Sequence, residues 1–430
     1  MTDFTSIRCL HVSRCLSTGA TVPVGQLAQN RDGVFFQYGE GYLREHPSLS
    51  PFQMPFDGSV HRAPRDPHEG LHGVFADSLP DGWGRLLMDR VFRQQGIASS
   101  QLTAMDRLSF IGERGVGALR YSPASPSAPA PPGEVGFWEL GTRAEELFDG
   151  EGEELLAFLA QAGSSGGARP KASVYLPADA AASGARILPA PGLEPWLVKF
   201  TSASLPLGYE EGLCEAAYLR LAQNAGIATP DWQLLQVPAE APSNATAWLA
   251  QRRFDCAPPG GRLHMHSLCG LLDADFRAPS MDYEDLIRAS QALCASPAVG
   301  QTQFIRAAFN LFAVNQDDHT RNWSFLQDDA GNWQPSPFYD VTFCPTPHDQ
   351  HTTAFLGHGS APPRKAMQHL AGQASFASWP HAREALERVV DALGKWPEVA
   401  SELGIRHDTR RLISDRLEAT RHANRELLDH

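Results

Sequence analysis

The stretch NQDDHTRNWSFL, residues 315–326, places two carboxylates, a histidine, an arginine and an asparagine within eight positions and ends in an apolar run. Asn322 follows Asp317 after four intervening residues, which is the D-x-x-x-x-N spacing of a protein-kinase catalytic loop. Phosphoryl transfer needs one carboxylate to accept the proton of the attacking hydroxyl and oxygen ligands to hold magnesium. Asp317 suits the first role and Asn322 the second. An ordinary solvated turn has the same spacing, so the neighbouring segments must decide.

The segments on either side favour the kinase interpretation. TQFIRAAFNLFAVN precedes the loop, and its apolar residues fall on one stripe of a predicted helix: Phe304, Ile305, Ala308, Phe309 and Phe312. An apolar stretch that resembles a hairpin follows the loop and leads to PFYDVTF, residues 337–343. Asp340 stands there between aromatic and β-branched residues, and we predict it to be a second magnesium ligand beside Asn322.

Two upstream features meet further demands of phosphoryl transfer, in the expected order. GSSGGARPKA, residues 163–172, is rich in glycine, which lets backbone N–H groups approach phosphates. Lys199 lies within the apolar strand WLVKF, where a charge is costly unless it is paired. We predict Glu215, on a following helix, as its counter-ion, with Glu211 as the alternative. Taken singly, the loop could be a flexible linker and the lysine could extend from a strand edge into solvent.

The length and composition of the chain limit the fold and the function that it can have. A chain of 430 residues is expected to fold as two or three packed units. Its net charge of −13 argues against a broad nucleic-acid-binding face, so any DNA contact would be made through a partner. We expect a cytoplasmic protein without membrane contact, because no run of about 18 apolar residues and no leader-like segment is present. Seven scattered cysteines without a CxxC pair predict reduced thiols.

A break in composition divides the chain. SPASPSAPAPPGE, residues 122–134, is too rich in Pro, Ala and Ser to pack a core, and we predict a linker there. It separates a small β-rich unit (1–121) from a mixed unit (135–260) and a helical unit (261–430). The predicted strands are GVFFQY, VGALRYS, WLVKFTS and TAWLAQRRFD, and the predicted helices are LPDGWGRLLMDRVFRQQG, EEGLCEAAYLRLAQNAG, TQFIRAAFNLFAVN, REALERVVDAL and TRRLISDRLEATRHANRELL.

Two histidine-containing stretches offer a rival metal chemistry. HEGLH, residues 68–72, matches the HExxH pattern of zinc peptidases, which requires both histidines on one face of a rigid helix. Pro67, Gly70 and Gly73 disfavour a helix, and we predict a surface turn leading into a strand, GVFA. In PHDQHTTAFLGHG, the three histidines are expected to be solvated loop residues: His348, His351 and His358.

Taken together, these segments resemble the HipA family, the serine/threonine-kinase toxins of bacterial toxin–antitoxin modules. FADSLPDGWGRLLMDR and LSFIGERGVGALRY resemble that family's N-terminal subdomain, GGARPKA its nucleotide loop, RRFD its adenine-contacting hinge, and NQDDHTRNWSFL with PFYD its catalytic and metal-binding segments. The resemblance implies an α+β, bilobed protein-kinase-like fold with a small N-terminal β-rich subdomain and an all-α C-terminal lobe. It also implies ATP and magnesium as cofactors, a DNA-binding helix-turn-helix antitoxin as partner, and an aminoacyl-tRNA synthetase as the protein substrate.

The resemblance assigns Asp317 as the catalytic base and Asn322 and Asp340 as metal ligands. The residues that it places at the nucleotide are Gly166, Gly167, Ala168, Arg169, Pro170, Lys171, Lys199, Arg252, Arg253, Phe254, His319, Thr320, Arg321, Asn322, Tyr339, Asp340, Val341 and Thr342. The chain departs from the family pattern in two places. Pro170 removes one backbone donor from the nucleotide loop. Asp318 stands where some members carry glycine, and it is expected to be a metal ligand or a solvated charge.

The resemblance further implies autophosphorylation of Ser164, with Ser165 as the alternative. A phosphoserine carries roughly −1.5 to −2 charges, which would repel a triphosphate from this loop. The sequence therefore predicts a self-limiting serine/threonine kinase. The alternative is an idle nucleotide-binding scaffold that acts as a co-repressor with its antitoxin, but such a scaffold would have no need of Asp317, Asn322 and Asp340 together.

Overall fold

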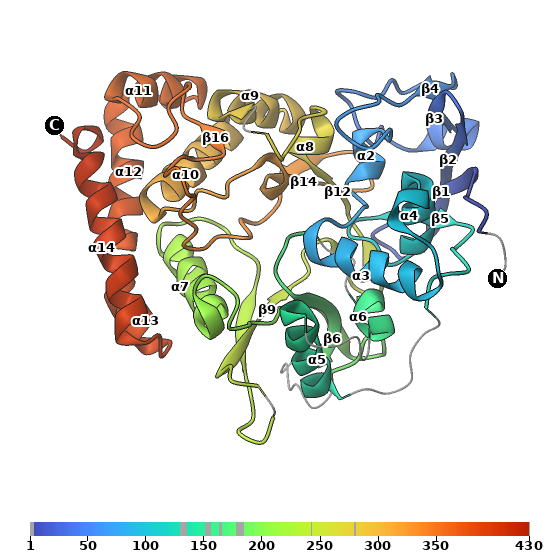
Figure 1. The fold of residues 1–430 in the computed structure, drawn as a ribbon. Helices are drawn as coiled ribbons and strands as arrows, with labels where there is room; N and C mark the ends of the chain where they lie inside the picture. Colours follow the sequence, from blue (N-terminus) through green and yellow to red (C-terminus); the bar gives the residue numbers. More distant parts are fainter. Residues whose placement is uncertain are drawn as a thin grey trace.

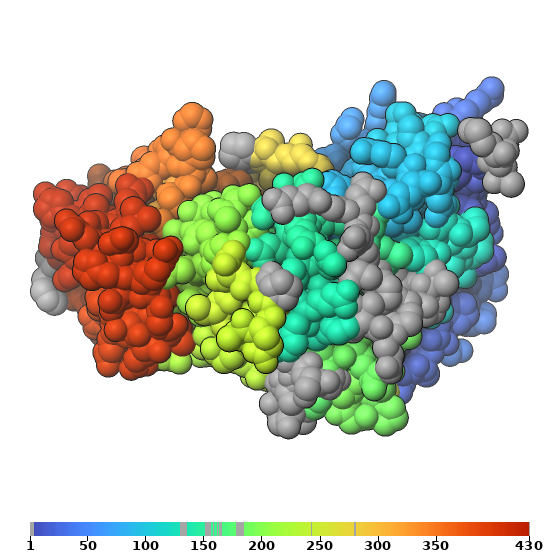
Figure 2. Space-filling view, turned by 60° about the horizontal axis from the view of Figure 1, so that its bottom comes forward, coloured from blue at the N-terminus to red at the C-terminus, as the bar shows by residue number. Residues whose placement is uncertain are grey.

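The structure is a computed structural model and describes residues 4–129, 136–150, 156–162, 166–177, 185–241, 243–278 and 281–429. The chain runs from an N-terminal unit through a middle unit to a set of C-terminal helices, and its two ends lie on opposite sides of the molecule (Figure 1). Figure 2 shows the same order from another side, with the C-terminal helices at one end and the N-terminal unit at the other.

The N-terminal unit is built around an antiparallel sheet in the order β4-β3-β2-β1-β5. Val34, Phe36 and Tyr38 alternate along one strand toward the core, as period-two patterning requires. The strands are β1 (Cys9–Cys15), β2 (Thr21–Asn30), β3 (Gly33–Tyr38), β4 (His61–Arg62) and β5 (Leu119–Ser122), and the helices are α1 (Glu40–Glu45), α2 (Gly73–Ala76), α3 (Gly82–Gln94) and α4 (Ala104–Ile111), with the 3₁₀ turn η1 (Ser99–Gln101).

The middle unit is a four-stranded antiparallel sheet in the order β6-β7-β9-β8. Its elements are α5 (Phe137–Asp149), α6 (Leu156–Ala162), β6 (Lys171–Pro177), β7 (Leu193–Lys199), η3 (Gly208–Glu210), α7 (Glu211–Asn224), β8 (Trp232–Gln236) and β9 (Ala247–Arg252). Helix α3 packs here and not on the N-terminal sheet, because Trp83, Leu87 and Phe92 share a buried core with Val174 and Val198. In Figure 1, α3 lies beside α6 accordingly.

The C-terminal unit is centred on the longest apolar helix, α10, which packs on α9, α12 and α14. Its elements are β10 (Cys256–Ala257), β11 (Gly261–Arg262), β12 (His264–Ser267), α8 (Leu268–Leu271), β13 (Met281–Asp282), α9 (Tyr283–Cys294), α10 (Pro297–Ala313), η4 (Thr320–Asn322), β14 (Ser324–Gln327), β15 (Trp333–Pro335), β16 (Thr353–Ala354), α11 (Arg364–Gln373), α12 (Trp379–Leu393), α13 (Trp396–Glu402), α14 (His407–Ala423) and η5 (Arg425–Leu427). The expected helical lobe is present, but it also contains the small sheets β12-β14-β15 and β13-β16, so it is not all-α.

Buried polar contacts tie the N-terminal unit to the rest of the molecule. Arg14 is completely buried, and its guanidinium donates to Gln327 Oε1 at 3.0 Å and to the carbonyl of Asp328 at 2.9 Å. Asp255 accepts a hydrogen bond from the backbone N–H of Gly117 at 2.7 Å. Because these contacts are buried, the three units form one packed body around the site described below.

The HEGLH stretch differs from its predicted structure. The predicted turn is present at residues 66–70, with Glu69 exposed, but His68 and His72 are each only 6% exposed. GVFA forms the short helix α2 and not a strand. Helix α2 packs so closely on α8 that a Cβ on Gly73 would lie 2.1 Å from the carbonyl oxygen of Gly270. Burial lowers the pKa of His72 to about 4. Within the described residues, no group of three or more His, Cys, Asp or Glu side chains could hold a metal ion.

Two further findings concern the whole molecule. All seven cysteines have free thiols. Among the helices in the described part of the chain, none combines the length and the apolar character that crossing a membrane requires. The apolar surfaces of the helices are instead used in the packed cores of the three units.

Candidate active site

A cavity of about 520 Å³ lies where the three units meet. The cavity is lined by Asp317, the predicted base, and by most of the residues that the resemblance placed at the nucleotide: Gly166, Gly167, Ala168, Arg169, Lys171, Lys199, Arg252, Arg253, Phe254, His319, Arg321, Asn322, Tyr339, Asp340 and Thr342. Pro170, Thr320 and Val341 do not line it, because their side chains are buried beside it. The residues named here, from Gly166 to Thr342, span 176 positions in the sequence and converge on one cavity of about nucleotide size.

Lys199, at the end of β7, is held between two carboxylates. Its Nζ atom lies 2.6 Å from Glu215 Oε1, on α7, and also contacts Asp340 Oδ1. Burial alone would lower the pKa of Lys199, but the carboxylates of Asp340 and Glu215 raise it above the ordinary value. The lysine is therefore charged although its side chain is only 5% exposed.

Glu211, the alternative counter-ion, has another partner. Its Oε2 atom lies 3.1 Å from Arg169 Nη2 in the glycine-rich loop. Glu211 begins α7 and Glu215 lies one turn further along, so the same helix face contacts both the loop and the strand lysine. In the structure Glu215 is thus the ion-pair partner of Lys199, and Glu211 is the partner of Arg169.

Asp340 combines an unusual backbone with a strongly ionised side chain. Its φ of 51° lies in the left-handed region, which is uncommon for non-glycine residues and clusters at functional sites. Burial would raise the pKa of Asp340, but Lys199 and Lys171 hold it well below the usual range. The preceding residue is also fixed: the hydroxyl of Tyr339 donates to the carbonyl of Arg321 at 2.8 Å and lies 2.6 Å from Ser324 Oγ.

The loop after α10 presents Asp317 to the cavity. Its side chain is 59% exposed and lies 3.8 Å from His319 Nε2. Desolvation at the cavity wall raises the pKa of Asp317, His319 opposes that shift, and Asp340 adds to it. Asn322, at the end of η4, donates its Nδ2 hydrogen to the carbonyl of Asp317 at 2.7 Å, so the side chain of Asn322 fixes the backbone at Asp317.

Asp318 is neither a metal ligand nor a solvated charge, contrary to the expectation from the sequence. It is 1% exposed, and its carboxylate accepts hydrogen bonds from Tyr283, from His351 Nδ1 at 2.9 Å and from the N–H of Thr352 at 2.8 Å. His351 is consequently buried and not a solvated loop residue. These contacts occupy the carboxylate of Asp318 and anchor the loop, so that of the two adjacent aspartates only Asp317 lines the cavity.

The described part of the glycine-rich loop, residues 166–170, contacts the side chain of Lys171. Lys171 Nζ donates to the carbonyl of Gly166 at 2.6 Å. Gly167 has a φ of 94°, and a Cβ there would lie 2.5 Å from Lys171 Nζ, so a side chain would displace the lysine. Ser164 and Ser165, the predicted phosphorylation sites, lie outside the described residues.

The segment after β9 forms the opposite wall. Arg252 pairs with Glu194 at 2.9 Å, and Arg253 forms a buried pair with Asp255 at 2.6 Å. Both guanidinium groups are therefore occupied by carboxylates. The ring of Phe254 lies 5.5 Å from that of Tyr339, which gives the wall an aromatic surface.

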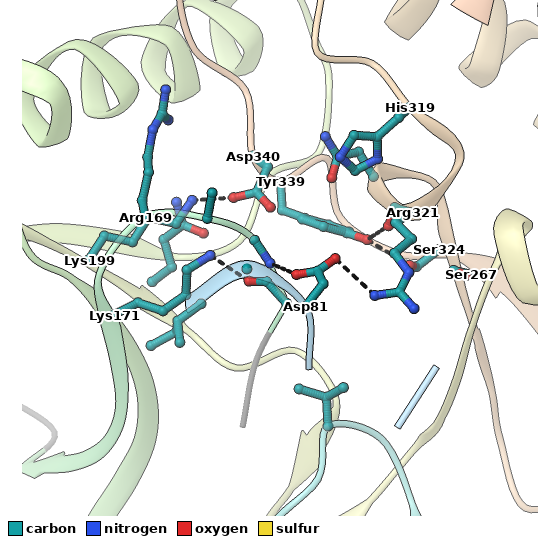
Figure 3. Close-up of a pocket in the computed structure, with 18 of the residues that line it drawn as sticks. Asp81, Arg169, Lys171, Lys199, Ser267, His319, Arg321, Ser324, Tyr339 and Asp340 are labelled. Carbon is teal, nitrogen blue, oxygen red and sulfur yellow. Dashed lines mark hydrogen bonds and ion pairs between the residues drawn. The ribbon is translucent and has the colours of Figure 1, made fainter. Parts of the chain in front are cut away.

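Sequence reasoning missed the contribution of the N-terminal unit to this site. Asp81, just before α3, contacts the backbone N–H of Gly167 and lies 2.8 Å from Arg321 Nη1 (Figure 3). Asp77 accepts hydrogen bonds from His266 Nδ1 and from the N–H of Ser267, both at 2.6 Å. Both carboxylates lie in FADSLPDGWG, but nothing local in that stretch indicates partners up to 240 positions away.

The residues present fit ATP and magnesium. Asp340 and Asn322 offer a carboxylate and an amide oxygen, the ligand types that magnesium prefers, with phosphate and water oxygens to complete the shell. Lys171, Lys199 and Arg169 supply positive charge for phosphates. Several buried polar atoms on the cavity wall have no hydrogen-bond partner within the described residues: Ser173 Oγ, Thr342 Oγ1 and His319 Nδ1. A polar ligand would satisfy them.

Comparison with known protein families gives two matches. The HipA-like C-terminal domain model matches residues 163–397, more than half of the chain. The HipA N-terminal domain model matches residues 19–122. The two matches cover most of the N-terminal unit, the glycine-rich loop, the strand lysine and the loop of residues 315–326. A search of curated protein sequences gave no match.

Among solved structures, HipA of Shewanella oneidensis MR-1, solved in a complex with HipB and operator DNA, is similar to this chain. It aligns with a TM-score of 0.64 and 18% identity over 97% of this chain and 96% of that one. This likeness confirms the predicted bilobed kinase-like fold. The proinflammatory kinase CtkA of Helicobacter pylori aligns with a TM-score of 0.38 and 12% identity over 61% of this chain and 91% of that one, too low a similarity to support an argument.

Proposed function

Because this chain belongs to the HipA family, we propose that it is a protein serine/threonine kinase that transfers the γ-phosphoryl group of ATP to a protein hydroxyl. The observation that carries the proposal is the ion-paired cluster of Lys199, Glu215 and Asp340 beside the cavity that Asp317 faces. A charged lysine between a helical glutamate and a metal-binding aspartate is the arrangement that phosphoryl transfer requires.

In this proposal the residues on each wall of the cavity bind a different part of the nucleotide or the metal ion. Phe254 and the backbone of Arg252 and Arg253 contact the adenine, while Lys199 and Lys171 bind the phosphates. Asp340 and Asn322 hold magnesium, which when bound neutralises the charge that develops on the phosphates. The hydrogen bond from Asn322 to the Asp317 carbonyl then fixes the base relative to the metal ligand.

Asp317 orients the acceptor hydroxyl and accepts its proton. Its exposed carboxylate can be reached by a side chain of a second protein, whereas the neighbouring Asp318 is fully enclosed. The raised pKa of Asp317 brings its basicity closer to what a general base needs. We expect general-base removal to reduce transfer by roughly 10²–10⁴-fold.

We further propose that the chain is the toxin of a toxin–antitoxin module in the cytoplasm. Its partner is a helix-turn-helix antitoxin, and DNA is contacted only through that partner, in line with the chain's net charge of −13. The protein substrate is an aminoacyl-tRNA synthetase by family resemblance. Autophosphorylation of Ser164, or alternatively Ser165, limits the activity, because a phosphoserine repels ATP from the loop.

Phosphoproteomics of cells that express the wild type beside Asp317→Asn tests the proposal. We expect one or a few proteins to gain phosphoserine or phosphothreonine with the wild type alone, and the purified kinase to transfer ³²P to them. ATP binding without any phosphate transfer would overturn the kinase assignment. It would identify the chain as an idle nucleotide-binding scaffold that acts as a co-repressor with its antitoxin.

A further inference from the structure

The segment of residues 81–83, which we call the DGW segment, contacts the glycine-rich loop along its backbone. The backbone N–H of Trp83 donates to the carbonyl of Gly167 at 3.0 Å, and its indole Nε1 donates to the carbonyl of Lys171 at 2.9 Å. The N–H of the same residue, Gly167, donates to Asp81 Oδ1. Both backbone groups of Gly167 are thus paired with the N-terminal unit.

The packing between the DGW segment and the glycine-rich loop leaves no space for a side chain at position 82. Gly82 has a φ of 39°, and a Cβ there would lie 2.6 Å from Ala168 Cα and 2.7 Å from the carbonyl oxygen of Gly167. Trp83 is 1% exposed and packs in the core of the middle unit. The loop therefore rests on a fixed support, and glycine at position 82 is required because any side chain would push the loop away.

Asp81 also reaches the catalytic loop with its second oxygen. Oδ2 lies 2.8 Å from Arg321 Nη1, and the two side chains are 14% and 19% exposed. In Figure 3, Asp81 lies between Arg321 and the glycine-rich loop, with a dashed contact to each. Arg321 is further fixed by the ring of Phe276, 4.4 Å from its guanidinium carbon. Although burial would raise it, the pKa of Asp81 is held below its ordinary value by Arg321 and Gly167.

We propose that Asp81 is a positioning residue of the kinase site, which fixes the glycine-rich loop relative to the catalytic loop. This inference rests on the proposed function and adds to it that nucleotide affinity depends on the N-terminal unit. A glycine-rich loop has many accessible conformations, so holding one of them before ATP arrives reduces the entropy lost on binding. Asp81 does so without occupying Lys171, Lys199 or Asp340.

The test is nucleotide affinity of the full chain, measured by calorimetry with Mg²⁺ and a non-hydrolysable ATP analogue. Asp81→Asn keeps an acceptor for Gly167 but loses the charge that pairs with Arg321, and Asp81→Ala loses both. We expect Kd to rise about ten-fold or more in Asp81→Ala and by a smaller factor in Asp81→Asn, since charge-assisted hydrogen bonds are the stronger ones. In kinetics, KM for ATP should rise more than kcat falls.

Asp89, on the helix α3 that begins directly after Asp81, provides the matched control. It forms an ion pair of 2.5 Å with the buried Arg107, away from the cavity. Asp89→Asn should lower the melting temperature about as much as Asp81→Asn does, and Kd should stay at the wild-type value. If Asp89→Asn raises Kd equally, the effect of Asp81 is general destabilisation and the proposal is wrong.

A double-mutant cycle with Arg321→Gln tests the coupling between the two loops. We expect Asp81→Asn and Arg321→Gln to be non-additive in Kd, the double variant being no weaker than the weaker single one. Hydrogen exchange of the Gly167 amide should also accelerate in Asp81→Ala. Wild-type binding with an unchanged Kd in Asp81→Ala would overturn this inference alone, whereas a wild type that binds no nucleotide would overturn the proposed function with it.

Discussion

Lys199 Nζ lies 2.6 Å from Glu215 Oε1, and the two side chains are 5% and 2% exposed. Glu215 Oε1 also accepts a hydrogen bond from Gln251 Nε2 at 2.8 Å, so the carboxylate is fixed from a second direction. The lysine thereby leaves β7 in one defined direction, toward Asp340 and the cavity.

Glu215→Gln and Lys199→Met should both reduce activity, to different extents. In Glu215→Gln the lysine keeps Asp340, and we expect kcat/KM to fall about ten-fold, as for loss of one charged hydrogen bond. Lys199→Met leaves two carboxylates without a cation, so activity should be lost and stability should fall by about 3–5 kcal/mol. Steady-state kinetics and urea unfolding measure both effects. Equal activity of the two variants would contradict the assigned pairing.

Asp317 and Asp318 are adjacent but should respond to substitution in opposite ways. Asp317→Asn should reduce kcat by roughly 10²–10⁴-fold and leave the melting temperature nearly unchanged, because the side chain is exposed. Asp318→Asn disturbs a buried network with Tyr283 and His351, so stability should fall by about 1–3 kcal/mol. Kinetics and thermal melts of both variants separate the roles. A stable, fully active Asp317→Asn would refute the assignment of the base.

If Asp340 binds magnesium beside ATP, the effects of ATP and of magnesium on thermal stability should depend on each other. Ligands that bind the folded state stabilise it, by about 2.7 kcal/mol at a concentration of 100 times Kd. We expect the melting temperature to rise more with ATP and magnesium together than with the sum of separate additions. The increase should shrink in Asp340→Ala and persist in Asp408→Ala, a fully exposed position on α14. No increase in the wild type would count against nucleotide binding.

Asp255 should make stability depend on pH. Burial would raise its pKa, but Arg253, Arg262 and the N–H of Gly117 hold it well below the ordinary value. Stability from this group is therefore present above the unfolded-state pKa of about 3.9 and is lost as the pH falls below it. Asp255→Ala should cost about 3–5 kcal/mol at pH 7.

Urea unfolding measures the free energy of unfolding of the wild type and of Asp255→Ala. The difference between these two free energies should be smaller at about pH 3 than at pH 7, because the wild type has then lost part of the stabilisation that Asp255 gives. Asp57→Ala is the control, since its partner His61 forms a surface pair and exposed ion pairs contribute little. A difference in unfolding free energy that stays constant between pH 7 and pH 3 would show that the pKa of Asp255 is the same in the folded and unfolded states, and would contradict the lowered pKa.

Ser164 lies outside the described residues, and its modification is predicted from the sequence. Incubation with Mg-ATP should add one phosphate to the wild type, and none to Asp317→Asn or Ser164→Ala. The phosphorylated protein should bind ATP weakly, because the added charge of roughly −1.5 to −2 lies beside the phosphate loop. Intact-mass spectrometry and calorimetry measure both. A wild type that phosphorylates another protein without gaining mass itself would disprove the self-limiting step alone.

The local sequence patterns correctly predicted those helices and strands whose apolar residues repeat with the helical or strand period. Phe304, Phe309 and Phe312 follow the helical repeat, and the structure forms α10 from Pro297 to Ala313. Helix α3 was predicted to begin near Pro80 and end at Gly96, and it spans Gly82–Gln94. Such patterns are readable because helix and strand periods reflect which side faces a core. GVFA is too short to show either period, and it forms a helix where a strand was predicted.

The sequence by itself also singled out the residues that we predict to carry the chemistry, since a lysine in an apolar strand, or an aspartate five positions before an asparagine, is recognisable without its partners. Only the tertiary structure decided that Asp318 is buried against His351, and that Asp81 joins Gly167 to Arg321. The physical reason is that burial and charge pairing depend on segments far apart in the chain. Asp81 and Arg321 are 240 positions apart. The local pattern of apolar residues does not indicate which carboxylate will pair with which arginine when the units pack.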